Sequence, residues 1–322
     1  MRSSPEFVAA RRTFSDIEEL RGVESKWALE VYQLGRGRFR FDAGLLYLPG
    51  LHMAEFSVSP GIRAVGSVPA DLYVLTVPVS NAPGFVGGKD LRSLDVVIIP
   101  PKGELDLTVP STFGYMIAAI PVEIFERQTH LMWGRNIAEG TSTRHFRLSS
   151  PGLRAEVIGR WRERLGWGMG ESERPRIPDS SGEVANLVFE PLVDLVAPVT
   201  YEHQDAGRIQ VARQAERFLR ANQEEAIAVQ SLIRHLGIPA RTLHQGFREA
   251  FGTTPRAYFN ALRLNSARED LSRPRQDHTV TSVALRWGFT HFGWFSANYR
   301  RMFGETPSHT LRRRSGRAPV PK

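Results

Sequence analysis

The amino-acid sequence predicts an α+β protein of two domains, and three observations carry this prediction. Short apolar and alternating runs recur between turn residues from about 29 to 120, a pattern typical of an all-β sandwich or barrel. From about 207 onward, apolar residues recur almost without interruption at helical spacing. The net charge of +8 is divided unequally, with −3 over residues 1–204 and +11 over residues 205–322. We therefore expect a β-rich domain at 1–204 and an all-helical domain at 205–322.

Five runs in the N-terminal part have the composition of strands, and glycine or proline pairs separate them. These runs are 29–34, 38–47, 71–79, 94–99 and 113–120. After about 121 the pattern becomes helical, with the best helix candidates at 154–165 and 183–196 and a polar loop or hinge at 168–182. We expect a β-barrel followed by helices.

Seven apolar residues of the expected strands are candidates for the interior of this barrel. An interior of this kind is either filled by its own side chains or holds one small molecule. We favour a filled core for most of the seven positions. They are Phe39, Phe41, Leu46, Phe56, Tyr73, Leu75 and Phe113.

A helical motif occurs twice in the C-terminal part. The segment 231–255 returns, with changes, as 282–307, so that Gly237 matches Gly288. In each copy a helix ends at glycine, a short turn follows, and a longer helix carries apolar residues at i, i+4 and i+8. A short turn between two such helices predicts a helix-turn-helix, whose second helix can enter the major groove of DNA.

The two helix-turn-helix motifs, expected at about 228–251 and 279–303, are joined by an expected helix at about 255–271. Thr254 and Pro255 suit the N-cap and the first position of that helix. Its 17 residues span roughly 26 Å at ~1.5 Å per residue, a length comparable with one turn of DNA, about 34 Å. Two such motifs in a basic region predict a domain that binds two successive major grooves.

The C-terminal part, residues 207–312, resembles the DNA-binding domain of the AraC/XylS family of bacterial transcription regulators. The residues that carry the resemblance are A-L-R-W-G-F at 284–289, F-S-A-N-Y-R-R-M-F-G-E-T-P at 295–307, and Tyr258 with L-R-L-N-S-A-R at 262–268. The resemblance implies a bacterial regulator that binds specific promoter DNA.

The N-terminal part resembles the cupin-like effector-binding and dimerisation domains that precede this module. The resemblance rests on Q-L-G-R-G-R-F-R at 33–40 and L-D-V-V-I-I-P-P-K-G at 94–103. It implies a cupin-like β-barrel for a small-molecule effector. It also favours a dimer seam along 183–196, although this helix would alternatively pack on the barrel.

The first helix-turn-helix departs from the family pattern at three positions. Ile233 occupies the small-residue position that Ala284 fills in the second copy. Ala228 replaces the hydroxyl N-cap that Thr279 supplies in the second copy, and Pro239 replaces a usual serine. Because the loss of a helix cap costs about 1 kcal/mol, we expect the second copy to form more readily.

Ten residues on the outward faces of the two second helices are expected to contact DNA. Arg241 and Gln245 suit guanine and adenine edges. Gly293 permits close approach of the backbone, and Ala297 or Phe292 suits a thymine methyl group. The ten residues are Arg241, Thr242, His244, Gln245 and Arg248 in the first copy, and Phe292, Gly293, Ser296, Ala297 and Arg300 in the second.

For other residues near these faces, the sequence allows more than one role, such as a core position, a contact to DNA or a contact to phosphate. Trp294 stands where many relatives carry a polar or basic residue, and we favour a core position for it. Phe292 is left open between core and DNA. Arg300, Arg301 and the arginines at 312–314 are expected to contact phosphates. The tail 312–322 is equally consistent with a disordered basic end.

Several classes of protein are excluded by what the sequence lacks. It contains no cysteine, which excludes a disulfide scaffold, a thiolate metal site and a cysteine nucleophile. His52, His130 and His145 form no His-x-His cluster, and no Gly-x-Ser-x-Gly occurs, so we expect no catalytic residue, metal or cofactor. The sequence shows neither an apolar signal core at its start nor the ~18 apolar residues of a membrane helix. We expect no membrane partner and a cytoplasmic, nucleoid-associated location.

The sequence thus predicts a DNA-binding transcription regulator, expected to be an activator, that responds to an unknown small-molecule effector through its N-terminal domain. The expected partners are double-stranded promoter DNA, a second copy of the chain to form a homodimer, and RNA polymerase. One alternative is a constitutive regulator whose N-terminal domain only dimerises. Another is a cupin-like enzyme with a DNA-binding appendage, against which the missing ligand cluster speaks.

Overall fold

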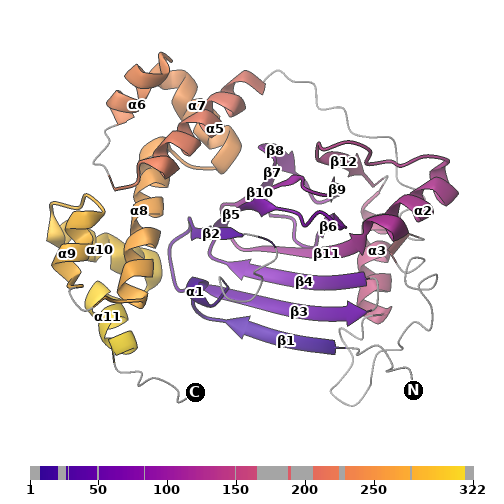
Figure 1. Ribbon diagram of the computed structural model, residues 1–322, viewed down its shortest axis with the longest axis horizontal. Coiled ribbons are helices and arrows are strands. Elements are labelled where there is room, and N and C mark those ends of the chain that lie inside the picture. The colour runs from indigo at the N-terminus through magenta and orange to yellow at the C-terminus, as the bar shows by residue number, and fades with distance from the viewer. Residues whose placement is uncertain are drawn as a thin grey trace.

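The computed structural model describes residues 8–20, 27, 29–48, 51–82, 84–148, 150–164, 188–189, 206–224, 229–275 and 278–315. Within these residues the chain forms a β-rich N-terminal domain and a helical C-terminal domain that lie side by side (Figure 1). The α+β class and the two kinds of domain expected from the sequence are therefore confirmed.

Two antiparallel sheets make up most of the β-rich domain. The large sheet has the strand order β1-β3-β4-β11-β6-β9-β12, and the small sheet has the order β2-β5-β10-β7-β8. No hydrogen-bonded strand pair joins the two sheets among the described residues, so the N-terminal domain is an open pair of sheets and not the closed barrel expected. The strands are β1 Val8–Phe14, β2 Glu30–Gln33, β3 Arg40–Leu48, β4 Leu51–Ser59, β5 Ile62–Ser67, β6 Leu72–Pro78, β7 Gly84–Val86, β8 Lys89–Leu91, β9 Asp95–Ile99, β10 Glu104–Val109, β11 Phe113–Pro121 and β12 Arg144–Arg147.

Both faces of the large sheet are covered, because successive side chains of a strand point to opposite faces. In β6, Val74 belongs to the core between the two sheets, whereas Leu75 belongs to a second core on the outer face. The helices α2 (Val122–Trp133) and α3 (Pro151–Arg164) complete this outer core, in which Trp161 is fully buried. A short helix, α1 (Ile17–Leu20), follows β1.

The helical domain has two small cores that share one helix. Leu262 of α8 belongs to the core of the first helix-turn-helix, and Leu264 belongs to the core of the second. One helix therefore joins both motifs, as the sequence predicted. None of the described helices has the length and apolar composition needed to span a membrane. The helices are α5 Ala206–Ala221, α6 Val229–Leu236, α7 Ala240–Phe251, α8 Pro255–Ser272, α9 Val280–Arg286, α10 Phe292–Phe303 and α11 Pro307–Ser315.

The five expected strands all overlap observed ones, but the expected runs did not include β1, β4, β5, β10 or β12, nor β7 and β8, which contain three residues each. A strand this short holds too few residues for an alternating pattern to be recognised. The helix expected at 154–165 is α3. The loop expected at 168–182 and most of the helix expected at 183–196 lie outside the described residues.

The seven apolar residues proposed as a filled interior have three different positions. Phe41, Phe56 and Phe113 line a cavity of about 330 Å³ between the two sheets, so the expectation of a filled core fails for them. Phe39 belongs to the core between the sheets without lining this cavity. The remaining three, Leu46, Tyr73 and Leu75, lie in the outer core.

Candidate nucleic-acid interface

The turn of the first helix-turn-helix depends on a glycine in a left-handed conformation. Gly237 has φ +63°, which side chains with a Cβ rarely adopt. The N–H of Ile238 donates to the carbonyl oxygen of Ile233 at 3.3 Å, which closes the end of α6. Pro239 is the N-cap residue of α7, with φ −63° and ψ 139° in the extended region and no side-chain cap.

The second helix of this motif, α7, has one buried and one exposed face. Leu243, Phe247 and Phe251 are buried, as their spacing predicted. Gly246 is also buried. A Cβ at this position would overlap the carbonyl oxygen of Arg208 in α5, so only glycine fits without a shift. The helix α7 therefore lies unusually close to α5.

The five residues of α7 proposed to contact DNA lie together on its other face. Arg241, His244 and Arg248 are exposed, and Thr242 and Gln245 are half-buried. This face therefore carries two guanidinium groups together with imidazole, amide and hydroxyl groups. These groups supply the hydrogen bonds by which base edges and phosphates are distinguished.

The second helix-turn-helix begins with a cap that the first lacks in sequence. The Thr279 hydroxyl accepts from the N–H of Ser282 at 3.0 Å, and the Ser282 hydroxyl accepts from the N–H of Thr279 at 2.9 Å. This reciprocal pair satisfies two backbone donors at the start of α9. At its end Gly288 has φ +72°, and the N–H of Phe289 donates to the Ala284 carbonyl oxygen at 2.8 Å.

The helix α10 presents a mainly apolar outward face. Phe292 and Trp294 are each 43% exposed, which places Phe292 outside the core. The core position favoured for Trp294 is wrong, because only one side of the ring is covered, by Phe289 at 5.9 Å between centroids. Gly293 has open space where a Cβ would stand.

The remaining α10 candidates add few hydrogen-bonding groups to this face. Ser296 is half-buried, and Ala297 and Arg300 are exposed. Phe295, Tyr299 and Phe303 are buried on the opposite face, as predicted, and they are separate from the candidates. Gly293, Ser296, Ala297 and Arg300 thus share the outward side of the helix, and Phe292 is exposed at its first position. This side suits apolar contacts and close approach of the backbone.

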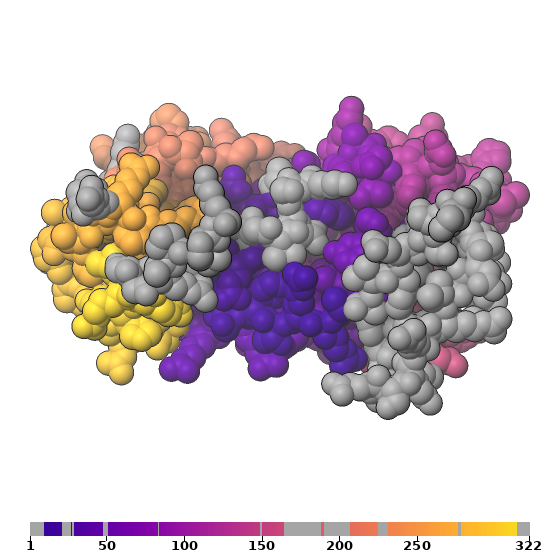
Figure 2. All heavy atoms as spheres, turned by 60° about the horizontal axis from the view of Figure 1, so that its bottom comes forward, coloured from indigo at the N-terminus to yellow at the C-terminus, as the bar shows by residue number. Residues whose placement is uncertain are grey.

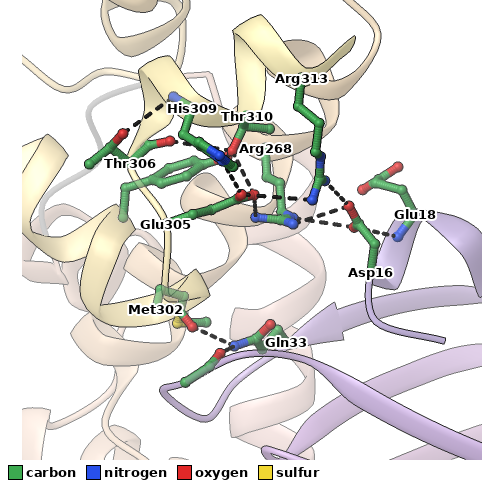
Figure 3. A network of polar contacts seen from close by, with 12 residues as sticks. Asp16, Glu18, Gln33, Arg268, Met302, Glu305, Thr306, His309, Thr310 and Arg313 are labelled. Carbon is green, nitrogen blue, oxygen red and sulfur yellow. Dashed lines mark hydrogen bonds and ion pairs between the residues drawn. The ribbon is translucent and has the colours of Figure 1, made fainter. Parts of the chain in front are cut away.

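A polar clamp joins the connecting helix α8 to the small sheet. The backbone N–H of Gln33 donates to Oδ1 of Asn265, and Nδ2 of Asn265 donates to the Gln33 carbonyl oxygen, both at 2.9 Å. Gln33 Nε2 also donates to the carbonyl oxygen of Met302 in α10 at 2.5 Å (Figure 3). Because β2 is an edge strand, Asn265 pairs backbone groups that would otherwise be left without a strand neighbour.

A first ionic cluster attaches α5 and α8 to the small sheet. Arg63 of β5 donates to both carboxylate oxygens of Glu216 at 3.0 Å, and it also pairs with Asp106. Tyr258 of α8 donates to Glu216 at 2.5 Å, and Arg213 of α5 donates to Asp106 at 2.5 Å. Burial opposes the charge on Arg63, but Asp106 and Glu216 raise its pKa above its ordinary value. Burial and the Glu216 carboxylate raise the pKa of Tyr258, which stays protonated.

A second ionic cluster attaches the second helix-turn-helix to the start of α1. Asp16 accepts from Arg268 of α8 at 3.1 Å and from Arg313 of α11 at 2.6 Å (Figure 3). Arg268 also pairs with Glu305 at 3.0 Å. Burial acts to raise the pKa of Asp16, but the two arginines lower it below its ordinary value.

The second ionic cluster corrects one expectation and reveals what the sequence did not indicate. Arg313, expected to bind phosphate, is paired with Asp16 and Glu305. In the space-filling view, the yellow residues near the C-terminus lie against the indigo and violet residues of the β-rich domain (Figure 2). The sequence analysis did not predict these contacts; the signal available for them is Arg63, which stands between the apolar residues Ile62 and Ala64.

The structure describes no cofactor or metal site in this region. No group of three or more histidine, aspartate and glutamate side chains is arranged to hold a metal ion anywhere in the described part of the chain. The outward faces of α7 and α10 carry exposed residues with chemistry suited to nucleic acid.

Comparison with known proteins places the helical domain among helix-turn-helix proteins. A family profile described as "Helix-turn-helix domain" matches residues 232–313. The chain is 37% identical over 103 residues to the probable thc operon regulatory protein of Rhodococcus erythropolis, covering 32% of this chain and 31% of the relative. It is 28% identical over 228 residues to XylDLEGF operon transcriptional activator 3 of Pseudomonas putida, covering 68% of this chain and 65% of the relative. The chain thus spans less than two thirds of the length of these two relatives.

One solved structure is also similar to part of the chain. It is a probable AraC family transcriptional regulator from Rhodopseudomonas palustris, 37% identical, and the match covers 33% of this chain and 97% of that chain with a TM-score of 0.31.

Proposed function

We propose that the chain is a regulator of the AraC/XylS type, and that it is a sequence-specific DNA-binding transcription activator controlled by a small molecule. The observation that carries the proposal is the pair of helix-turn-helix motifs on one helix, α8, each with an outward face of exposed residues. Because α8 contributes to both cores, the two motifs are held in one arrangement. Two readers in a fixed arrangement can address one side of a DNA duplex.

The two readers have different proposed roles. Arg241 and Gln245 of α7 contact base edges, and Arg248 and His244 contact a base or a phosphate. In α10, Phe292 and Ala297 contact thymine methyl groups, and Gly293 lets the backbone approach the duplex. Thr242, Ser296 and Arg300 supply further polar contacts. Sequence preference is therefore stronger in the half-site read by α7.

The first test is a selection of binding sites from a random DNA pool with the full chain. We expect enrichment of a site with two half-sites about one helical turn apart. Enrichment of no motif would contradict the proposal.

The second test compares Arg241→Ala with Arg12→Ala on the selected site and on random DNA. Arg12 is an exposed arginine of β1, outside the helical domain, and serves as the matched control. A bidentate contact to guanine accounts for ~1–3 kcal/mol of discrimination, so Arg241→Ala should weaken binding to the selected site by about 10- to 100-fold. Equal losses on both DNAs would make Arg241 a phosphate contact. Arg12→Ala should change neither affinity.

The proposal of a small-molecule effector is supported by the cavity between the two sheets. Its volume of about 330 Å³ lies within the range of ligand pockets, about 300–1,000 Å³. A constitutive regulator with an N-terminal domain that only dimerises would bind its DNA site equally well with every small molecule added. The enzyme alternative is set aside, because the relatives are transcription regulators.

A homodimer and RNA polymerase remain proposed partners. The seam proposed for the dimer, 183–196, lies outside the described residues apart from Val188 and Phe189. These two residues are buried in the outer core of the β-rich domain, which favours packing on the domain for that part of the segment. Sedimentation of the full chain with and without its selected DNA site tests for the dimer. A homodimer would have a protein mass twice that of one chain.

A further inference from the structure

The cavity between the two sheets has walls made of apolar side chains from nearly every strand. Its lining includes Phe41 and Phe56 of the large sheet and Val31, Ala64 and Leu107 of the small sheet. A cavity of about 330 Å³ in a well-packed interior is an exception, because protein cores hold few voids larger than a water molecule. An apolar void does not hold water stably, so an apolar molecule gains by filling it.

The pairing of strands shows which side chains of the small sheet face the cavity. Val31 of β2 and Leu107 of β10 both lie directly opposite Ala64 of β5. Residues opposite one another on neighbouring antiparallel strands share a face, so these three form one row along the cavity. Val86 of β7 lies opposite Leu107 and extends the row.

The next rows of the small sheet face the helical domain. Arg63 lies between Ile62 and Ala64 in β5, so its side chain points away from the cavity. Glu30 and Asp106 both lie opposite Val65, on the face that carries Arg63. Glu30 and Asp106 both border the cavity. Their carboxylates nevertheless pair with arginines of α5, Glu30 with Arg220 and Asp106 with Arg213. The small sheet is therefore one layer with a ligand cavity on one side and the helical domain on the other.

The described lining offers no charged group to a ligand. The carboxylates of Glu30 and Asp106 are already paired with arginines on the opposite face. The hydroxyl of Thr76 donates to the Met116 carbonyl oxygen at 3.2 Å. A carboxylate or an ammonium group placed in this cavity would lose its hydration without gaining a counter-ion, which is costly.

From these observations we infer that the cavity binds an uncharged, hydrophobic small molecule and that the small sheet transmits its presence to α5. The inference rests on the proposed function and names the chemical class of its effector. A ligand that presses on Val31, Ala64 and Leu107 moves the strands that also carry Glu30 and Asp106. The arginine pairs with α5 then change, and α5 packs directly against α7 at Gly246.

Three probes with one common body test the chemical class. They are 4-isopropyltoluene, which is uncharged, 4-isopropylbenzoate, which is an anion, and 4-isopropylbenzylamine, which is a cation at pH 7. Binding to the full chain is measured as a rise in Tm with probe concentration. We expect 4-isopropyltoluene to bind, and both charged probes to bind at least ~100-fold more weakly. Equal or tighter binding of a charged probe, or no binding of 4-isopropyltoluene, overturns the inference.

Three alanine-to-leucine variants test the location. Ala64→Leu and Ala43→Leu place extra volume in the cavity from opposite sheets, and Ala257→Leu is an exposed control in α8. Both cavity variants should weaken binding of 4-isopropyltoluene by at least about tenfold, and the control should not. Unchanged binding in folded cavity variants overturns the site. If both cavity variants unfold, the variant Trp27→Phe tests the site instead, because Trp27 lines the cavity. The change in tryptophan fluorescence that 4-isopropyltoluene causes should be smaller in this variant than in the wild-type chain.

The transmission is tested by DNA affinity with and without 4-isopropyltoluene. Saturating probe should change the affinity of the wild-type chain for its selected site by about fivefold or more. In the double variant Arg213→Gln/Arg220→Gln the probe should still bind, but the change in affinity should be lost. No change in the wild-type chain overturns the transmission. Affinity without probe tests the proposed function separately, so the two failures are distinguishable.

Discussion

The two helix-turn-helix motifs share one plan but differ in the surface that they present. The outward face of α7 is polar, with Arg241, His244 and Arg248 exposed. The outward face of α10 exposes the aromatic side chains of Phe292 and Trp294. Hydrogen-bonding groups distinguish base edges, whereas apolar groups detect methyl groups and shape. Under the proposed function, the duplicated fold supplies two readers with different selectivity.

The two motifs also differ in how they are attached to the β-rich domain. The first is held by Arg63, whose side chain is 1% exposed, through Glu216 and Asp106. The second is held by Asp16, which pairs with Arg268 inside and with Arg313, whose side chain is 44% exposed. Because solvent screens exposed pairs, the first attachment is expected to be the stronger.

The largest expected effect concerns the first attachment. Glu216→Gln removes one charge from a buried cluster and leaves Arg63 short of a counter-ion. We expect the free energy of unfolding to fall by about 3 kcal/mol. Urea unfolding of the full chain measures this, with Glu224→Gln as control, because Glu224 forms an exposed pair with Arg286. A loss as small as that of the control would show that the buried cluster does not stabilise the fold.

The next effect concerns the second attachment and depends on pH. Asp16→Asn should lower the free energy of unfolding by about 2 kcal/mol at pH 7. Burial raises the pKa of Asp16, but Arg268 and Arg313 lower it overall, so its contribution is present above the ordinary aspartate value, about 3.9, and is lost as pH falls through the folded value.

Urea unfolding at pH 7, 5 and 3 checks the pH dependence of Asp16. The difference between wild type and Asp16→Asn should be similar at pH 7 and 5 and smaller at pH 3. A difference that does not change with pH would show that the Asp16 carboxylate has the same pKa in the folded and unfolded chain.

A pair of glycine substitutions compares the packing of the two second helices. Gly246→Ala places a Cβ against the Arg208 carbonyl oxygen, and we expect a loss of about 2 kcal/mol. Gly293→Ala places a Cβ in open space on α10, so its higher helix propensity should stabilise the domain by about 0.5 kcal/mol. Thermal unfolding measures both. Equal effects would mean that α7 is packed no more closely than α10.

The smallest expected loss of stability concerns the cap of the second motif. Thr279→Ala removes the hydroxyl that accepts from Ser282 N–H, and the expected loss is about 1 kcal/mol. Thr281→Ala, an exposed threonine in the same helix, is the matched control. Comparable losses in both variants, measured by urea unfolding, would show that the cap contributes little.

Local patterns in the sequence predicted the helical domain closely. The spacing of Leu243, Phe247 and Phe251 identified the buried face of α7, and Thr254 caps α8 by accepting from the N–H of Ala257 as expected. Trp294 was placed in the core because a large aromatic residue is usually buried. Its actual exposure depends on which other elements pack against α10. Those elements are distant in sequence, so the local pattern of residues does not predict the contact.

The β-rich domain was predicted less completely, since its structure depends on pairing between distant strands. Phe41, Phe56 and Phe113 were expected to fill a core, but whether they do depends on the spacing of two sheets. The candidate DNA contacts could be proposed from the sequence, because each of the two sets lies on a single helix. The polar clamp between Gln33 and Asn265 was not found, because its residues are 232 positions apart.

The sequence by itself determined the two helix-turn-helix motifs, since helical periodicity, glycine turns and caps act within a few residues of the chain. It also located the basic charge of +11 in residues 205–322. Only the tertiary structure decided that other arginines, such as Arg63 and Arg268, are buried between the domains. The reason is physical: the cost of burying a charge depends on the counter-ion that the fold brings to it from elsewhere in the chain.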